Sequence, residues 1–231
     1  MKNNKLGIII FVRLGSKRLP NKAFTKIKNI YSLEHVYRRV KRVDSKLKII
    51  EATTKTKLDN KIVNYCKLKK IKFFRGSNKN VVLRAIKCCE NYNFNSFLRV
   101  CADRIFFDFI LARKMIEFYK KNNFEIVTNC LSKTYPEGLG CEIVNLHILK
   151  KNHKYMNSSD KEHILNYFYR NNKKFKIKNF RCNFPKNVSN ISMALDNESD
   201  LYKINKAYNE LKISSKTKSK KIINYFLNNF Y

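Results

Sequence analysis

Apolar runs alternate with amphipathic segments along most of the chain. Short aliphatic or β-branched runs predict strands at 6–12, 47–52, 71–74, 96–102 and 125–128, and helical spacing of apolar residues predicts helices at 33–42, 58–69, 81–91 and 109–119. This alternation favours an α/β fold, a doubly wound and mostly parallel sheet. Because such sheets bind ligands beyond the carboxyl ends of their strands, the residues that follow each strand are the first candidates for function.

The second half of the chain is less regular. Strands are predicted at 138–146, 175–179 and 187–196, and helices at 161–169, 198–211 and 222–230. We expect one domain over 1–213 with a small embellishment near 132–182, followed at 214–231 by a basic linker and a C-terminal amphipathic helix. The last helix is expected to pack on the domain, join a dimer or touch a membrane, and its aromatic residues favour core or interface.

The charge of the chain admits two explanations. Fifty Lys and Arg against 17 Asp and Glu give a formal net charge of +33 over 231 residues. An anionic partner such as nucleic acid, a membrane surface or a phosphorylated substrate would account for it. The lysines are spread over the whole length and accompany abundant Asn, Ile, Phe and Tyr, which favours a compositional bias towards A/T-rich codons.

Apolar runs and cysteines indicate a cytoplasmic protein. No run approaches the roughly 18 apolar residues that span a bilayer, and the first residues lack the features of a signal peptide. The seven cysteines are scattered, with no C-x-x-C pair and no zinc spacing with the four histidines. We expect reduced thiols that pack as small hydrophobic groups.

One short basic loop follows the first predicted strand. The segment "RLGSKRLPNK", 13–22, holds a glycine that permits close backbone approach, a hydroxyl, a stiffening proline and four cations: Gly15, Ser16, Pro20, Arg13, Lys17, Arg18 and Lys22. These groups suit a triphosphate, although the spacing is not that of a P-loop. A solvated basic turn is the alternative.

Two carboxylates follow strands at the same expected edge. Asp103 comes after the strand at 96–102 and Asp196 ends the one at 187–196. Mg²⁺ typically takes one or two protein carboxylates together with phosphates, so both are candidate ligands, with turn or cap duty as the alternative. Asp59 is more typical of a helix cap or a surface group, and Asp200 either of the same site or of a helix N-terminus.

These segments resemble the sugar cytidylyltransferases, which activate acidic sugars such as 3-deoxy-manno-octulosonate and nonulosonates with CTP. The first loop is similar to the family signature R-x-G-S-x-R-L-P-x-K. The spore-coat-polysaccharide type is most similar, over roughly residues 6–205, with further matches in "EATT", "FFRGSNKNVVLRA", "LRVCADRIFFD", "TYPEGLGCEI", "KEHI" and "LDNESDL". The first motif is specific, and the others are persuasive as a series.

The resemblance implies a nucleotidyltransferase that transfers CMP to a sugar for surface polysaccharide synthesis and releases pyrophosphate. It implies these nucleotide-binding residues: Arg13, Gly15, Ser16, Lys17, Arg18, Lys22, Ala52, Thr53, Arg75, Gly76 and Ser77. It implies these sugar-facing residues: Tyr135, Pro136, Glu137, Gly138, Glu142, Glu162 and His163. Asp103 and Asp196 would hold Mg²⁺, and with Arg13 and Lys22 they would form the catalytic set. It also suggests a homodimer that contacts through 132–182.

The chain departs from the family pattern at a few positions. Asn21 stands where the first loop usually has Gly, neutral or basic residues replace the usual acids at 78–80, and Ile105 replaces a proline. The general base also stays open, because His163 and Glu142 are equally compatible with structural roles.

Three other functions remain possible from the sequence. One is an inactive relative that binds nucleotide or serves as an assembly subunit, and another is a nucleotidyltransferase with a different acceptor, such as a sugar phosphate. The third is a basic nucleic-acid-binding protein, although no helix-turn-helix, RRM or zinc signature is found. We expect no specific nucleic-acid partner and no stable membrane insertion.

Overall fold

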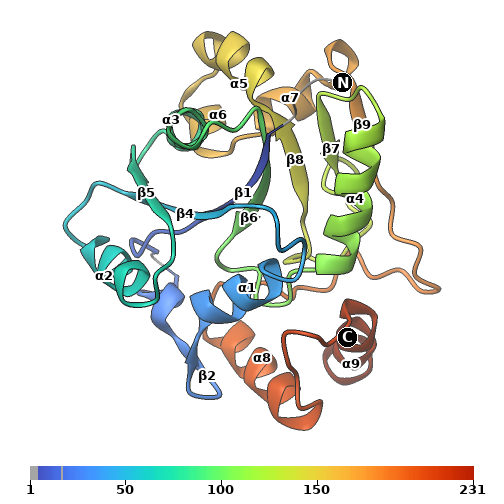
Figure 1. Cartoon of the computed structure of the whole chain (residues 1–231). Coiled ribbons are helices and arrows are strands. Elements are labelled where there is room, and N and C mark those ends of the chain that lie inside the picture. The colour runs from blue at the N-terminus through green and yellow to red at the C-terminus, as the bar shows by residue number, and fades with distance from the viewer. Residues whose placement is uncertain (1–4, 17) are drawn as a thin grey trace.

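A computed structural model describes residues 5–16 and 18–231, so the candidate Lys17 lies outside the described residues. Its centre is a sheet with the strand order β5-β4-β1-β6-β8-β7-β9 (Figure 1). The strands are β5 (Phe73–Gly76), β4 (Ile49–Thr54), β1 (Leu6–Phe11), β6 (Ser96–Cys101), β8 (Glu142–Asn145), β7 (Ile126–Thr128) and β9 (Ile177–Asn179). Only β8 runs antiparallel to its neighbours among these strands, which confirms the predicted mostly parallel sheet.

Helices cover both faces of the sheet. One face packs against α1 (Ser32–Val40), α2 (Asn60–Leu68), α4 (Phe109–Lys121), α8 (Glu198–Glu210) and α9 (Ser219–Phe230). The other packs against α3 (Val81–Tyr92), α5 (Leu146–Asn152), α7 (Asn166–Arg170) and the turn after α6 (Ser158–Glu162). In Figure 1, α3, α5, α6 and α7 group at the top, and α1, α8 and α9 at the bottom.

The first strand shows why its sequence is apolar without alternation. Ile8 and Ile10 are buried on one face of the sheet, whereas Ile9 and Phe11 are buried on the other. A strand covered by helices on both faces must be apolar at successive positions. The continuous run at 6–12 therefore reflects its central place in a doubly wound sheet.

Side-chain caps fix the starts of several helices. Asn80 accepts a hydrogen bond from the Leu83 amide at the start of α3, at 2.8 Å. Asn197 and Asp200 form a reciprocal capping box at the start of α8. The helix N-terminus, one of the two roles considered for Asp200, is therefore the one it has.

Two predicted elements differ from the structure. Residues 187–196 form no strand, only an isolated bridge between Ser192 and Glu137, because the neighbouring backbone belongs to a loop rather than to a strand. The helix predicted at 161–169 is divided into α6 and α7, with His163 leaving the helical conformation at φ −113° and ψ 89°. The turn between them buries Ile164 and Leu165 against the sheet face that α3 also covers.

The region 132–182 contributes to the sheet itself. It supplies β8 and β9, the helices α5, α6 and α7, and the short 3₁₀ helices η2 (His153–Tyr155) and η3 (Asn172–Lys174). Before it, a 3₁₀ helix η1 (Lys22–Phe24) and a small hairpin of β2 (Lys26–Ile27) and β3 (Ile30–Tyr31) connect the first loop to α1.

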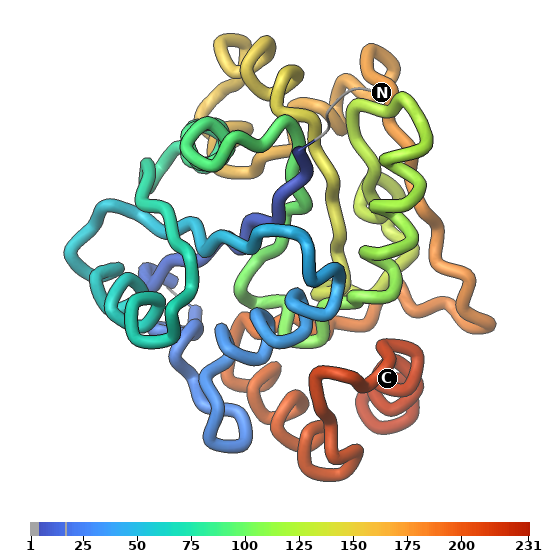
Figure 2. Tube along the Cα trace, viewed as in Figure 1, coloured from blue at the N-terminus to red at the C-terminus, as the bar shows by residue number. Residues whose placement is uncertain are grey.

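The C-terminal segment packs on the domain. The Phe226 ring of α9 contacts the Phe106 ring edge-on with 5.5 Å between centroids, and Arg39 of α1 donates to the Ser214 and Thr217 carbonyls. Figure 2 shows this red segment lying beside the orange segment of α8. Within the described residues, no helix is both long and apolar enough to cross a bilayer.

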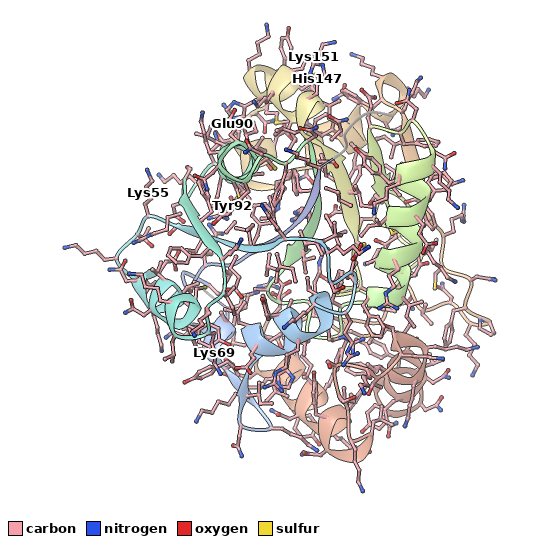
Figure 3. All side chains as sticks on the ribbon, viewed as in Figure 1. Lys55, Lys69, Glu90, Tyr92, His147 and Lys151 are labelled. Carbon is pink, nitrogen blue, oxygen red and sulfur yellow. The ribbon has the colours of Figure 1, made fainter. Side chains whose placement is uncertain are left out.

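Lysine side chains occur in separate parts of the structure. Figure 3 shows side chains projecting from all sides of the ribbon, with Lys55, Lys69 and Lys151 at separate parts of the outline. These lysines follow β4, follow α2 and belong to α5, respectively.

Candidate active site

A cavity of about 650 Å³ opens at the carboxyl ends of β1 and β6. Its charged lining consists of Arg13, Arg18, Lys22, Arg84, Arg99, Asp103, Glu162 and Asp196, and Gly15, Ser16 and His163 complete its polar part. The basic loop and both predicted metal ligands therefore meet in one place, although 174 positions separate Lys22 from Asp196.

The start of the basic loop is held by Asp59. The Asp59 carboxylate accepts hydrogen bonds from the amides of Leu14, at 2.9 Å, and Thr54, at 3.2 Å, and from the Thr54 hydroxyl. Asp59 is 1% exposed and makes no side-chain cap bond to α2. Asp59 does occupy the N-cap position of α2, as expected, but it is not a surface group, because the end of β4 and the first loop enclose its carboxylate.

The first loop has Asn21 at the position where glycine is usual, and its backbone conformation shows why asparagine is tolerated there. Its backbone is left-handed, with φ 55° and ψ 24°, immediately before Lys22 begins η1. Glycine adopts this conformation most readily, and asparagine is among the few other residues that tolerate it. The replacement is therefore compatible with the turn that directs Lys22 into the cavity.

Lys22 bridges the two aspartates. Its ammonium lies 3.2 Å from Asp103 Oδ2 and 2.9 Å from Asp196 Oδ1, and Arg18 lies 3.2 Å from Asp196 Oδ2. Burial alone would lower the pKa of Lys22, but the two carboxylates outweigh burial and raise it. Asp103 and Asp196 thus converge on a single position that already accommodates a cation.

Backbone contacts fix the relative position of these aspartates. The Leu195 amide donates to the Asp103 carbonyl at 3.0 Å, and the Asp196 amide donates to Asp200 Oδ2 at 3.0 Å. The first links the loop after β6 to the chain before α8, and the second ties that chain to the α8 capping box. Asp196 reaches the edge although it does not end a strand.

The other wall of the cavity carries Glu162 and His163. Arg13 forms an ion pair of 2.8 Å with Glu162, and both side chains are more than two-fifths exposed. Because α6 ends at Glu162, the bend that divides the predicted helix lies at the cavity. Two of the predicted sugar-facing residues therefore share a cavity with the basic loop.

Five predicted nucleotide-binding residues lie outside this lining. Ala52 and Thr53 are buried in β4, and Arg75 donates to the carbonyls of Thr54 and Thr56, both at 2.9 Å. Gly76 and Ser77 contact Arg84, since a Cβ at Gly76 would lie 2.7 Å from its Cγ and the Ser77 carbonyl accepts from its Nη1 at 3.2 Å.

Arg84 and Arg99 are charged cavity residues that sequence reasoning missed. Arg84 lies in α3 among the buried neighbours Val82, Ala85 and Ile86, at 3% exposure. A single arginine on an otherwise apolar helical face was the available signal. In a lysine-rich chain, a single cation is a weak signal by itself.

A second cavity of about 270 Å³ gathers most of the other predicted sugar-facing residues. Its lining is Arg104, Asn129, Cys130, Lys133, Tyr135, Pro136, Glu137, Gly138 and Gly140. Gly138 has φ +91°, and a Cβ there would lie 2.6 Å from the Ala194 amide nitrogen. Only glycine fits this position of the wall without strain.

Glu142 lies between the two cavities rather than in either lining. It is 3% exposed, pairs with Arg99 of the first cavity, and lies 3.6 Å from Arg104 of the second. The Tyr169 hydroxyl donates to its other oxygen at 2.8 Å. Burial opposes the charge, but the two arginines outweigh burial and lower the pKa of Glu142. The structure thus gives Glu142 protein partners on both oxygens, and its predicted role towards the sugar stays a prediction.

Comparisons with known proteins identify related chains. A family model described as cytidylyltransferase matches residues 7–229. A Methanocaldococcus jannaschii protein described as uncharacterised is 35% identical over 172 residues, 73% of this chain and 69% of that protein. The spore coat polysaccharide biosynthesis protein SpsF of Bacillus subtilis is 27% identical over 152 residues, 63% of this chain and 61% of that protein.

A solved structure shows the same fold along nearly the whole chain. The structure of a cytidylyltransferase from Leptospira borgpetersenii aligns with a TM-score of 0.92 at 24% identity, covering 98% of this chain and 95% of that chain. The strand order and the cavity edge described above therefore belong to a fold already seen in a cytidylyltransferase.

Proposed function

Because the chain belongs to the cytidylyltransferase family, we propose that it transfers CMP from CTP to a sugar and releases pyrophosphate. The acceptor we propose is an acidic 2-keto-3-deoxy sugar used for a surface polysaccharide. The observation that carries the proposal is the convergence of Lys22, Asp103 and Asp196 beside the basic loop. A phosphate-binding loop and a pair of metal ligands at one edge are what such a transfer requires.

The donor set suits Mg²⁺. Asp103 and Asp196 direct one carboxylate oxygen each at the same cation, the Lys22 ammonium. Two carboxylates together with nucleotide phosphates match the way in which Mg²⁺ is usually held. Bound there, the ion would neutralise phosphate charge and orient the reacting groups.

The residues of this chain would act by positioning and charge. Arg13, Arg18 and Lys22 would bind the triphosphate, with Gly15 allowing the phosphates to approach the backbone. Lys22 would exchange its carboxylate partners for phosphate oxygens and stabilise the negative charge that grows as pyrophosphate leaves. The sugar hydroxyl would attack the α-phosphorus of CTP in line with the bond between that phosphorus and the leaving pyrophosphate oxygen. Holding the two reactants in this geometry reduces the entropic barrier.

The second cavity is the place we propose for the remainder of the acceptor. Lys133 and Arg104 give its lining two cations against the single carboxylate of Glu137, which favours an anionic sugar. Its Arg104 follows Asp103 directly in the chain. An acceptor bound in the second cavity would thus lie close to the proposed metal ligand Asp103.

Thermal unfolding with CTP, UTP, ATP and GTP, each with and without Mg²⁺ at moderate salt, tests the nucleotide. A CTP-selective rise in melting temperature that requires Mg²⁺ is expected, because a ligand bound only by the native state stabilises it. Pyrophosphate release with a panel of sugar acids then identifies the acceptor. Equal small shifts with all four nucleotides would contradict the proposal and indicate general attraction of polyanions.

Three further assignments belong to this proposal. We propose a cytoplasmic enzyme, Mg²⁺ as its metal and a homodimer formed through 132–182. Light scattering coupled to gel filtration measures the dimer, and a monomer at micromolar concentration would contradict it.

A further inference from the structure

Arg84 is a buried cation without a carboxylate partner. Its side chain is 3% exposed, and it forms no salt bridge with any residue that the structure describes. Its Nη1 donates to the Ser77 carbonyl at 3.2 Å, and its Nε has no hydrogen-bond partner. A buried guanidinium is costly unless its charge and its donors are compensated.

The surroundings of Arg84 increase this cost. Burial and then the nearby Arg13 lower the pKa of Arg84 to about 10. Attraction to the Asp59 carboxylate opposes this shift only in part, and the Phe11 ring centroid lies 5.7 Å from the guanidinium carbon. A helical position whose neighbours are Val82 and Ala85 would be more stable with an apolar side chain.

The position of Arg84 indicates what would compensate it. It lines the first cavity together with Phe11, Arg13 and the loop residues Gly15 and Ser16. Close cations repel each other when the cavity is empty, and an anion between them converts this repulsion into attraction. Residues that weaken stability without local compensation are expected at functional sites.

We propose that Arg84 is a nucleotide-binding residue that completes the triphosphate site from the α3 side and contacts a phosphate oxygen. This inference rests on the proposed function, because it assigns a fourth cation to the site formed by Arg13, Arg18 and Lys22. Gly76 then has a role as well, since its missing side chain leaves room for the Arg84 stem.

Arg39 offers a matched control. It is 1% exposed and has an unpartnered Nη2, but it lies away from the cavity and donates to the carbonyls of Phe107, Ser214 and Thr217 at 2.8, 3.4 and 3.0 Å. Substitution of either arginine by methionine removes one positive charge and keeps an unbranched stem. The pair therefore separates a local phosphate contact from the general field of a +33 protein.

The experiment measures binding of inorganic triphosphate, CTP and cytidine by calorimetry, with unfolding temperatures of the ligand-free proteins. For Arg84→Met we expect at least tenfold weaker binding of triphosphate and CTP, unchanged binding of cytidine, and an unfolding temperature that is equal or higher. For Arg39→Met we expect a lower unfolding temperature and unchanged triphosphate binding by the folded protein.

Two outcomes overturn the inference: triphosphate binding by Arg84→Met within twofold of the unchanged protein, or an equal loss of cytidine binding, which would assign Arg84 to the nucleoside. If Arg84→Met does not fold, the pair Arg84→Lys and Arg84→Gln decides. Tighter triphosphate binding by the lysine variant supports the inference, and equal binding overturns it. A protein that binds triphosphate through Arg84 but shows no preference for CTP would contradict the proposed function alone.

Discussion

Two clusters of ion pairs lie close together in this molecule and differ in their access to solvent. At the sheet edge, Lys22 joins Asp103 and Asp196, whose side chains are 27% and 17% exposed. Beneath it, Arg99 and Arg104 enclose Glu142, which is 3% exposed. Both clusters combine cations with carboxylates, but the carboxylates of the first line a cavity, whereas Glu142 is in the lining of neither cavity.

The difference separates exchangeable contacts from permanent ones. Asp103 and Asp196 at the sheet edge can exchange the Lys22 ammonium for another cation, because water and ligands reach their carboxylates. Glu142 has no such freedom, since both of its oxygens are bonded to side chains from β6 and α7. The buried cluster thus holds the two cavity walls together, and the edge cluster is available for chemistry.

The largest expected effect is on stability at the buried cluster. Glu142→Ala should lower the free energy of unfolding by about 3–5 kcal/mol, because it leaves two largely buried arginines without their carboxylate. Urea denaturation measures it. Glu162→Ala, which breaks an exposed pair, should cost less than about 1 kcal/mol. Similar losses in both variants would show that the two environments do not differ as described.

The next effect is on turnover at the edge cluster. Asp196→Asn should leave stability nearly unchanged and lower the rate of pyrophosphate release by a hundredfold or more, about 2.7 kcal/mol at ~1.36 kcal/mol per decade. The asparagine keeps the shape of the side chain but loses the charge that holds Lys22. A variant with full activity would remove Asp196 from the mechanism.

A third carboxylate sharpens the comparison because it forms no ion pair with any described residue. Glu51 in β4 is 0% exposed, and its one bonded oxygen accepts from the Cys66 thiol. Burial raises the pKa of Glu51 to about 7. A raised folded-state pKa favours the neutral acid, so its contribution to stability is complete below about pH 4.5 and is lost as the pH rises through about 7.

Glu51→Gln removes this titration. Relative to the variant, the unchanged protein should lose about 2 kcal/mol of stability between pH 5 and pH 8. Thermal or urea unfolding at a series of pH values measures the difference. A difference between the two proteins that stays constant with pH would mean that Glu51 is charged throughout, and hence compensated by a group other than Cys66.

The smallest effect concerns the hydroxyl that supports the buried cluster. Tyr169 bonds to Glu142 and to the Thr128 hydroxyl, both at 2.8 Å. Tyr169→Phe should lower the free energy of unfolding by about 1.5 kcal/mol, because the hydrogen bonds to the Glu142 carboxylate and to the Thr128 hydroxyl are both lost. Tyr92→Phe, which loses a bond to the Phe73 carbonyl at 2.8 Å in a part-buried place, provides the control. A larger loss at Tyr92 would contradict the importance assigned to the cluster.

The order of apolar and polar residues predicted those features that depend only on neighbouring positions in the chain. The apolar run at 6–12 predicted β1, and the position of the basic loop after it predicted the ligand edge. The strand predicted at 187–196 failed for a physical reason. Buried apolar residues such as Val188 and Met193 can pack from an irregular segment as well as from a strand, and the choice depends on whether a partner strand is present.

The sequence by itself determined the fold class, the basic loop and the two aspartates, because periodicity and a rare arrangement of residue types are properties of neighbouring positions. Only the tertiary structure decided that Glu142 is enclosed, that Asp59 supports the loop and that Arg84 faces the cavity. Each of these depends on which segments distant in sequence surround a side chain. Burial and charge compensation are therefore properties of the folded neighbourhood, and no local pattern of residues specifies them.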